Sequence, residues 1–495
     1  MTELIDAAPS AWTPDLSEAP GPKYAAIADL LARDVQAGRL KPGDRLPPQR
    51  DLAWRLGVTV GTVTRGYREA ERRGLVAGEV GRGTFVRARS DRLRPLFDRG
   101  GAGDGPGLPW SAGDPVMEES PSAPEQGPIA LQSNILTPGS EAHLLRRTLA
   151  EMAADDTSAT EELLSYQPRQ AASRFRRAGI SWLARRGLEA VEGDVAVSAG
   201  AHNGLMSTFA AILKPGQRVL TEALTYPGVK TIAKLLDLEL VPGALDAEGL
   251  TVEAVADAAA AGRIDAVYTV PTLQNPTTAT MSEQRRRDIA AVCERFEIPI
   301  VEDDICGLFP PDAPAPLVRY APSTGYYVTS LSKTLAAGLR IGFVKTPPRM
   351  RDVVAASIRA CTWMASPITA EIATRWIESG GADAVLAERR AVLESRAQRA
   401  REVLDGFSFR LPPGGLHLWL DLPRPWRASQ FVAAAAARDV LLTAAHAFTV
   451  GDAPLPPAVR VCLGGPASDE RLAEGLERLR RILEDVDPLS DSEVM

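Results

Sequence analysis

The sequence predicts an α/β protein with two folded parts, a small helical module carrying a β-hairpin and a large domain with a mostly parallel sheet. The chain of 495 residues is too long for one ordinary domain. Glycine, proline, serine and acidic residues crowd positions 95–128, a composition typical of a flexible linker. After this linker, helical stretches alternate with short β-branched runs, which is the pattern of a doubly wound sheet.

Four β-branched runs predict strands of this sheet at 218–221, 266–270, 298–302 and 326–329. The divisions that we expect along the chain are a disordered leader at 1–20, the small module at 21–90, the linker at 91–128, the large domain at 129–486 and an acidic tail at 487–495.

The net charge of −7 conceals an asymmetry between the two parts. Residues 22–90 carry 14 Lys/Arg against 7 Asp/Glu, a net charge of +7 that leaves −14 for the rest. A basic module on an acidic body indicates a polyanionic partner for the module alone. No apolar run approaches the ~20 residues that span a bilayer, so we expect a cytoplasmic protein without membrane contact. The four cysteines lack metal-type spacing, which predicts reduced thiols and no metal site.

The elements of the small module follow from helical periodicity and from its punctuating residues. Apolar residues at helical spacing predict a first helix over 24–37, Pro48 opens a second over 49–56, and a third spans roughly 61–73. Residues 79–86 then predict a hairpin with a glycine-bearing tip. Helix, turn, helix and small wing form a winged helix-turn-helix, which places its third helix in a DNA major groove.

Short hydroxyl side chains at the start of the third helix, and arginines around it, suit contacts with phosphates and base edges. Each arginine taken alone is more often an ordinary surface residue, but the whole pattern taken in order indicates DNA binding. The candidate DNA-binding residues are Arg50, Thr59, Thr62, Thr64, Arg65, Arg82 and Gly83.

Two segments of this module, LKPGDRLPPQRDLA at 40–53 and GRGTFV at 81–86, resemble the GntR-type winged-helix module. The resemblance implies that Arg50 and the start of the recognition helix contact DNA. Val60 and Gly61 stand where that family usually has an arginine and a small polar residue. A base-reading side chain is therefore missing, and the operator sequence cannot be transferred from relatives.

The large domain contains the residue types that a covalently held aldehyde cofactor needs. Lys333 offers an amine for a Schiff base, and Ser330 and Arg340 can hold a phosphate dianion. The glycine turn before Ala201 and His202 can present backbone N–H groups to the same phosphate, or it can be a simple strand-to-helix turn. For the imidazole of His202 we expect no more than a place in the first turn of a helix.

Three further side chains can contact the ring of such a cofactor, and each has a plainer alternative. Asp303 ends a strand and can keep a pyridine nitrogen protonated, although acidic strand ends are also common helix caps. Asn275 can donate to a ring oxygen, although Asn-Pro is also a routine turn. Tyr226 can stack on an aromatic ring, or it can be a core tyrosine.

The order of these motifs resembles the fold-type-I, class I aminotransferases over residues 129–481. The resemblance implies a mostly parallel large domain, a smaller α/β domain, and pyridoxal 5'-phosphate held as a Schiff base by Lys333. It implies that Tyr166 reaches the phosphate of the partner subunit in a homodimer, and that Arg460 binds the α-carboxylate of an amino acid. The other implied cofactor contacts are Ala201, His202, Ser330 and Arg340 at the phosphate, Asp303 at the pyridine nitrogen, Asn275 at the ring hydroxyl and Tyr226 on the ring face.

Ile305 and Cys306 stand where that family usually has a tyrosine bonded to the ring hydroxyl, which predicts weakened transamination with cofactor binding retained. A GntR-type head on an aminotransferase-like body is the architecture of the MocR-type regulators. This resemblance implies a transcriptional regulator that binds double-stranded operator DNA and senses an amino compound or the cofactor. Two alternatives stay open: a working aminotransferase with an accessory head, and a DNA-binding protein whose body is a dimerisation scaffold without cofactor.

Overall fold

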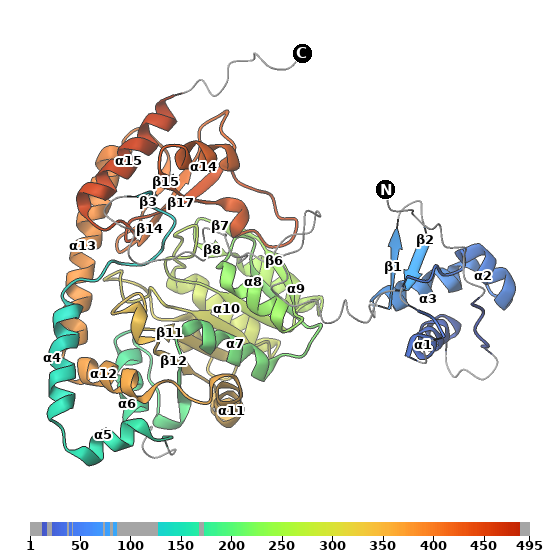
Figure 1. Cartoon of the computed structure of the whole chain (residues 1–495), viewed down its shortest axis with the longest axis horizontal. Coiled ribbons are helices and arrows are strands. Elements are labelled where there is room, and N and C mark those ends of the chain that lie inside the picture. The colour runs from blue at the N-terminus through green and yellow to red at the C-terminus, as the bar shows by residue number, and fades with distance from the viewer. Residues whose placement is uncertain are drawn as a thin grey trace, which may run out of the picture. The chain divides into compact units, whose positions relative to one another are not determined.

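The computed structural model describes residues 12–16, 22–36, 39–41, 43–72, 75–79, 83–86, 127–167 and 173–485. The chain divides into two compact units, residues 1–105 and 106–495, which we call the head and the body. Figure 1 shows the elements of each unit. None of the described helices has the length and apolar character needed to cross a membrane.

The head is a winged helix-turn-helix, as the sequence predicts. Ile27, Leu31, Leu52, Val63 and Tyr67 from its three helices share one buried core. The second helix ends where Gly57 adopts a left-handed conformation with φ of 60°. The elements are α1 Lys23–Gln36, α2 Gln49–Leu56, α3 Val60–Arg72, β1 Val76–Glu79 and β2 Gly83–Val86, the two strands pairing antiparallel.

Two features of the head go beyond the sequence prediction. The segment around Arg45 pairs with strand β2 of the wing. The N–H of Leu46 donates to the carbonyl of Thr84 over 2.8 Å, and an isolated antiparallel bridge joins Arg45 to Phe85. Trp12, which the sequence analysis places in the leader, packs on the head core and donates its indole N–H to the carboxylate of Asp34 over 2.8 Å.

The body is built on a seven-stranded sheet whose strands are parallel except for one. That strand, β12, runs antiparallel to both of its neighbours. The four strands predicted from β-branched runs are all present. In spatial order the strands are β4 Val195–Ser198, β12 Gly342–Lys345, β11 Gly325–Ser330, β10 Ile300–Asp303, β9 Ala266–Thr269, β5 Arg218–Glu222 and β6 Glu239–Gly243.

Helices cover both faces of this sheet, which confirms the doubly wound prediction. Val267 and Ile300 pack against α9 and α10, whereas Tyr268 and Val301, one residue further along, pack against α7 and α8. The helices are α7 Ala201–Ile212, α8 Pro227–Leu235 and α11 Arg351–Thr362 on one face, and α9 Val252–Ala260 and α10 Glu283–Arg295 on the other.

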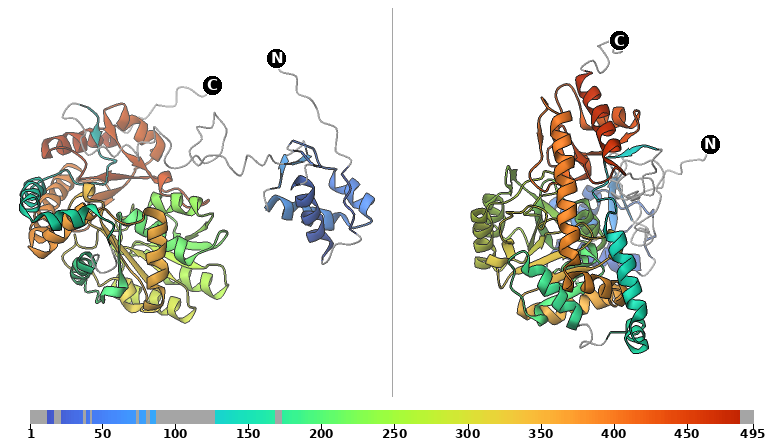
Figure 2. Two further views of the ribbon diagram at one scale, coloured as in Figure 1. Left: turned by 60° about the horizontal axis from the view of Figure 1, so that its bottom comes forward. Right: turned by 90° about the vertical axis from the view of Figure 1, so that its left-hand side faces the viewer.

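A second, antiparallel sheet forms the smaller part of the body, and one long helix joins both parts. Leu386 and Leu393 of helix α13 belong to the core beside the large sheet, while Ala397 and Ala400 belong to the core of the small part. Figure 2 shows α13, in orange, running from one part to the other. The remaining elements are β3 Ile129–Ala130, α4 Glu141–Ala154, α5 Thr157–Leu164, α6 Ser173–Ala184, β7 Leu245–Asp246, β8 Gly249–Leu250, α12 Pro367–Glu378, α13 Gly381–Val403, β13 Phe409–Arg410, β14 His417–Asp421, α14 Ala428–Ala436, β15 Val440–Leu441, β16 Thr443–Ala444, β17 Ala458–Cys462 and α15 Asp469–Glu484.

Candidate functional site

Lys333 lies just after strand β11 and contacts two elements that are distant in the sequence. Its ammonium group donates to the backbone carbonyl of Asn134. Its own carbonyl accepts from Nη1 of Arg389 in α13 over 3.2 Å, and Nη2 of that arginine donates to Glu141 of α4 over 2.6 Å. The lysine is therefore positioned by the large sheet, by helix α13 and by the segment that leads into α4.

The start of α7 lies beside the guanidinium of Arg340. Gly200 precedes the helix with φ of 89°, and a Cβ on it would approach Nη2 of Arg340 to 2.7 Å, so only glycine suits this position. Nη1 of Arg340 donates to the hydroxyl of Ser332 over 3.3 Å, and Nη2 donates to the carbonyl of Ala199 over 3.4 Å. A guanidinium next to a helix N-terminus attracts a dianion such as a phosphate.

Three predicted phosphate contacts gather at this place. Ala201 and His202 are the first two residues of α7, and burial together with the charge of Arg340 lowers the pKa of His202. Ser330 is buried at the end of β11, and its hydroxyl accepts from the N–H of Ser332 over 3.4 Å. The contacts of Arg340, Ser332 and Ser330 link the end of β11 to the start of α7, and their hydroxyl and guanidinium groups are of the kinds that can bind a phosphate.

Asp303 ends β10 with one carboxylate oxygen paired and the other unpaired. Its Oδ2 accepts from the hydroxyl of Tyr268 over 2.9 Å, whereas its buried Oδ1 has no hydrogen-bond partner among the described residues. Burial raises the pKa of Asp303 to about 7, and the charges of Asp304 and Glu222 add to the rise. A cationic N–H at Oδ1 would satisfy the oxygen and lower this pKa, so the site suits the pyridinium of the expected cofactor.

Arg460 lies on β17 with its guanidinium almost fully buried. Its Nη1 donates to Oδ1 of Asn275 over 3.0 Å and its Nη2 donates to the carbonyl of Gln132 over 2.7 Å, while Nε has no partner among the described residues. The guanidinium also lies over the ring of Phe448, 5.0 Å from its centre. These hydrogen-bond partners are neutral oxygens, and a buried cation is better balanced by an anion, so the site suits a carboxylate.

The two predicted tyrosines lie in different surroundings. Tyr226 precedes α8 and is half buried, with its ring so close to Gly228 that a Cβ there would approach it to 2.3 Å. Tyr166 is 76% exposed, and its ring packs edge-on against Trp363, which is itself 61% exposed, with ring centres 5.7 Å apart. Among the described residues, no contact joins Tyr166 to the other predicted cofactor residues.

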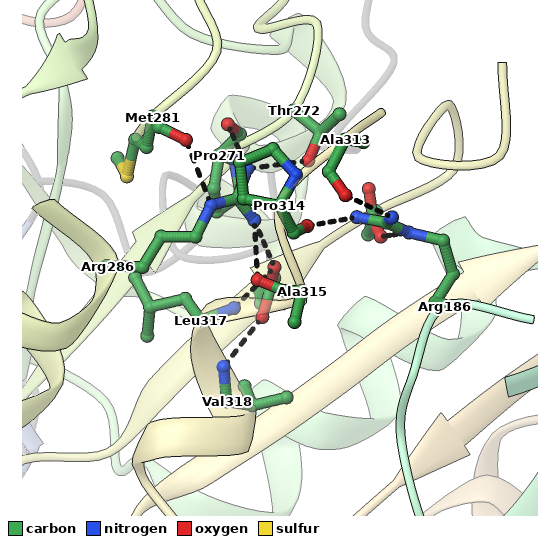
Figure 3. A network of polar contacts seen from close by, with 12 residues as sticks. Arg186, Pro271, Thr272, Met281, Arg286, Ala313, Pro314, Ala315, Leu317 and Val318 are labelled. Atoms are coloured by element: carbon green, nitrogen blue, oxygen red, sulfur yellow. Dashed lines mark hydrogen bonds and ion pairs between the residues drawn. The ribbon is translucent and has the colours of Figure 1, made fainter. Parts of the chain in front are cut away.

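Behind the site, on the other face of β10, two buried arginines hold the acidic run that contains Asp303 (Figure 3). Arg186 donates to Asp304 over 2.9 Å, and Arg286 lies 3.6 Å from Glu302, whose pKa burial raises to about 7. Arg286 also donates to the carbonyl oxygens of Met281 and Pro271, and Glu302 accepts from the N–H groups of Leu317 and Val318. This network fixes the end of β10 and the start of the loop that carries Asn275.

Several residues around the site were missed by the sequence reasoning. Cys306, named there only as a departure, is buried, and burial raises its pKa to about 12 while the charge of Lys333 acts in the opposite direction. His417 places Nε2 3.1 Å from the carbonyl of Pro276 and leaves Nδ1 unpartnered among the described residues. An acidic run at a strand end was a visible signal for the arginine network, but no local signal indicated His417, Tyr268, Arg389 or segment 132–134.

In the head, the hydroxyls at the start of α3 are partly used within the protein. The hydroxyl of Thr59 accepts from the N–H of Thr62 over 3.2 Å, which caps α3. The hydroxyl of Thr64 lies 2.7 Å from Oε1 of Gln49 in α2. Thr59 is exposed on the surface of the head, whereas Thr64 joins two helices.

The predicted arginines of the head also differ. Arg50 is exposed on α2, whereas the guanidinium of Arg65 lies over the ring of Tyr24 in α1, 4.2 Å from its centre. Gly83 begins β2 with φ of 121°, and a Cβ there would approach Nε of Arg45 to 2.8 Å. Arg82, the predicted tip of the wing, lies outside the described residues.

Comparisons with known proteins agree with this division. Residues 127–479 match the family described as aminotransferase class I and II, and residues 23–86 match the gntR family of bacterial regulatory proteins. The uncharacterized HTH-type transcriptional regulator YdeF of Bacillus subtilis is 29% identical over 97% of this chain and 98% of its own length. The HTH-type transcriptional regulator TauR of Rhodobacter capsulatus is 27% identical over 80% of this chain and 83% of its own.

Solved aminotransferases share the fold of the body. The multiple substrate aminotransferase of Thermococcus profundus has a TM-score of 0.68 at 22% identity, covering 81% of this chain and 99% of its own. Kynurenine aminotransferase of Pyrococcus horikoshii, solved in complex with pyridoxamine phosphate, has a TM-score of 0.66 at 22% identity, covering 74% and 93%. The chain belongs to the aminotransferase class I and II family, and the GntR-type head that precedes this body gives it the architecture of the MocR-type transcriptional regulators.

Proposed function

We propose that this protein regulates transcription by binding DNA through its head and by sensing an amino compound at a pyridoxal phosphate site in its body. The observation that carries the proposal is the arrangement around segment 132–134. The carbonyl of Asn134 accepts from the ammonium group of Lys333, and the carbonyl of Gln132 accepts from the guanidinium of Arg460. One short segment thus contacts both a reactive amine, Lys333, and a buried cation, Arg460. In this proposal Lys333 holds the cofactor that reacts with the amino group of an amino acid, and Arg460 pairs with its carboxylate.

In this proposal the residues of the site form two groups, one that binds the phosphate of the cofactor and one that contacts its ring. Pyridoxal phosphate supplies an aldehyde that condenses with amines and a ring that withdraws electrons. Lys333 provides the amine that holds the cofactor. In this proposal Ala201, His202, Ser330 and Arg340 bind the phosphate, Asp303 accepts from the pyridine nitrogen, Asn275 contacts the ring hydroxyl and Tyr226 covers one face of the ring.

The proposal includes a homodimer. Tyr166 and Trp363 form an exposed aromatic pair beside a cavity of about 540 Å³, whose lining includes Arg351 and Val197. A second copy of the body would cover such a patch, and a tyrosine on it would reach the phosphate site of that copy.

The regulatory step requires an effector that binds one arrangement of the dimer better than another, because equal affinity for both arrangements would shift nothing. The carboxylate of the effector would pair with Arg460, and Lys333 would hold the cofactor, whose aldehyde can condense with amines. The linker, residues 91–128 in the division proposed from the sequence, would then change which operator spacing the two heads can span.

The test measures the DNA affinity of the full-length protein loaded with pyridoxal phosphate, on genomic fragments that the protein itself captures. We expect an amino compound that changes the visible absorption band to change this affinity about tenfold or more. The Lys333→Ala variant should keep its basal DNA affinity and lose both responses. An undiminished effect of the amino compound on DNA affinity in that variant contradicts the proposal.

A working aminotransferase is the second candidate, favoured by the cofactor contacts predicted for Lys333, Asp303, Asn275 and Arg340. Cys306, however, places a buried thiol where the resemblance expects a tyrosine hydroxyl, and a thiol is a weak hydrogen-bond donor. Amino-group exchange with a keto acid over many turnovers per subunit would support the enzyme. Exchange that stops at one amino group per subunit would support the sensor.

A further inference from the structure

Segment 132–134 carries three successive buried side chains with unpartnered polar atoms. Gln132, Ser133 and Asn134 are 4%, 1% and 6% exposed. Among the described residues, Oε1 of Gln132, Oγ of Ser133 and Oδ1 of Asn134 have no hydrogen-bond partner. Buried polar atoms are almost always paired, and each unpaired one costs about 1–3 kcal/mol. Three in a row, in a segment whose backbone contacts Lys333 and Arg460, indicate atoms that await a ligand.

The backbone of this segment is firmly held, so the unpaired side chains do not reflect a loose loop. The N–H of Cys462 in β17 donates to the carbonyl of Leu131 over 2.7 Å. A Cβ on Gly465 would approach the carbonyl of Ala130 to 2.3 Å, so the chain at Gly465 lies tightly against the segment. A fixed backbone with unsatisfied side chains is the arrangement of a preformed polar binding surface.

Strand β14, which pairs with the strand of Arg460, adds a fourth unpaired acceptor. A carbonyl oxygen can only accept, so Nε2 of His417 donates its hydrogen to Pro276 over 3.1 Å. Burial, followed by the charge of Arg460, lowers the pKa of His417 to about 3, so the imidazole is neutral. Its buried Nδ1 is then an acceptor, and it has no partner within the described parts of the chain.

We propose that Gln132, Ser133, Asn134 and His417 form a polar pocket that selects effectors whose side chain carries N–H or O–H groups over effectors with a hydrocarbon side chain. This inference rests on the proposed function, in which the cofactor held by Lys333 reacts with the amine of the effector and Arg460 pairs with its carboxylate. A hydrocarbon side chain leaves these polar atoms unpaired. Sites built to hydrogen-bond a ligand reject isosteres that lack the donor far more strongly than apolar pockets reject a small change in size.

The test uses isothermal calorimetry on the full-length protein loaded with pyridoxal phosphate, with two matched sets of probes. L-Glutamine is compared with L-methionine, and L-homoserine is compared with L-norvaline. We expect the donor-bearing member of at least one set to bind tenfold or more tightly than its isostere. In Gln132→Leu, Ser133→Ala and His417→Phe this ratio should fall several-fold, while the melting temperature of Ser133→Ala should stay level or rise, because an unpaired hydroxyl is removed.

Ser207→Ala is the matched control, since it also deletes a buried hydroxyl that has no partner among the described residues, but within helix α7. It should leave the ratio unchanged. Equal affinity for donor-bearing and apolar probes, or a ratio unaffected by Ser133→Ala, overturns the inference while the sensing function stands. No heat from any probe, with the cofactor bound, overturns both. If Gln132→Leu fails to fold, the probe comparison in the parent and Ser133→Ala still decides the matter.

Discussion

The head and the body differ in where the polar groups available to a ligand lie. They are exposed to water on the head and largely buried within the site of the body. In the head, the side chain of Arg50 is exposed, and water hydrates it until a large partner binds. In the body, Oδ1 of Asp303 and Nε of Arg460 are buried and unpartnered among the described residues. Exposed charges match an extended polyanion whose phosphates replace water, whereas buried unpartnered atoms match a small ligand of defined chemistry.

Because of this difference, a single residue is weaker evidence for a binding site in the head than in the body. A lone exposed arginine indicates little, because most surface charges have no ligand, and the case for the head depends on the order of its whole motif. A single buried carboxylate oxygen without a partner indicates much, because the unfavourable free energy of burying it must be offset by something. Substitutions at buried or half-buried site residues of the body should therefore act in an all-or-none manner, whereas substitutions at exposed residues should weaken binding in graded steps.

The largest effect is expected for Lys333→Ala. Without the amine, the visible absorption of the cofactor and every response to amino compounds should disappear, while the head binds DNA as before. Lys214→Ala, at an exposed lysine, should leave the spectrum unchanged. A spectrum retained by Lys333→Ala would remove the basis for an all-or-none site in the body.

Asp303→Asn should stabilise the cofactor-free protein in a pH-dependent way. A folded pKa of about 7, above that of the unfolded chain, means that ionised Asp303 destabilises the fold at high pH and that this penalty fades between pH 7 and 4. With each pKa unit equivalent to about 1.4 kcal/mol, the variant should gain a few kcal/mol at pH 8 and little at pH 4. Chemical denaturation at both pH values measures the gain, and an equal gain at pH 8 and pH 4 would show that Asp303 is not strained when ionised.

Arg340→Ala should weaken cofactor binding about 10- to 150-fold. Charge-assisted hydrogen bonds to a phosphate contribute about 1.5–3 kcal/mol, and the exposed Arg340 already lies at the helix start. Arg349→Ala supplies an exposed control. Fluorescence titration with pyridoxal phosphate gives both affinities, and similar values for the two variants would place the phosphate elsewhere.

Arg50→Ala should weaken DNA binding by about 1–3 kcal/mol and leave the absorption spectrum of the body unchanged. Arg33→Ala is the control, because Arg33 is an exposed arginine of α1 that lies 3.9 Å from Asp34 and is not among the predicted DNA-binding residues. Fluorescence anisotropy with captured DNA at two salt concentrations measures both the affinity and the number of phosphate contacts. A loss for Arg33→Ala as large as that for Arg50→Ala would mean that only overall charge matters.

The smallest effect is expected for Arg65→Ala. Its guanidinium lies over Tyr24, so the substitution should cost about 0.5–1 kcal/mol of head stability and weaken DNA binding less than Arg50→Ala does. Denaturation followed by tryptophan fluorescence measures the stability. A larger loss of DNA affinity than for Arg50→Ala would show that Arg65 leaves the ring to contact DNA.

Much of the fold could be predicted from the sequence, because it depends on local patterns. Turn glycines such as Gly57, and the β-branched runs of the four predicted strands, mark elements without reference to the rest of the chain. The exceptions in the head are contacts between segments. The pairing of Leu46 with Thr84 and the packing of Trp12 on α1 depend on a tertiary arrangement that periodicity does not encode.

The residues of the site also fall into those that local motifs predict and those that only tertiary contacts bring to the site. Lys333, Arg340 and Asp303 stand in recognisable motifs at strand ends, so the sequence alone was enough to name them. The contact of Lys333 with Asn134 spans 199 positions, and Gln132, Ser133 and Asn134 form no motif. Side chains that select a ligand are placed by the folded chain as a whole, so a pattern search along the sequence passes over them.

The central claim is that the body holds pyridoxal phosphate covalently on Lys333. Borohydride reduction of the protein purified with cofactor, followed by peptide mass spectrometry, tests it directly, because the chain has only seven lysines and each peptide can be assigned. We predict one phosphopyridoxyl group on the peptide that contains Lys333. A protein without the group, or with the group on another lysine, contradicts the account.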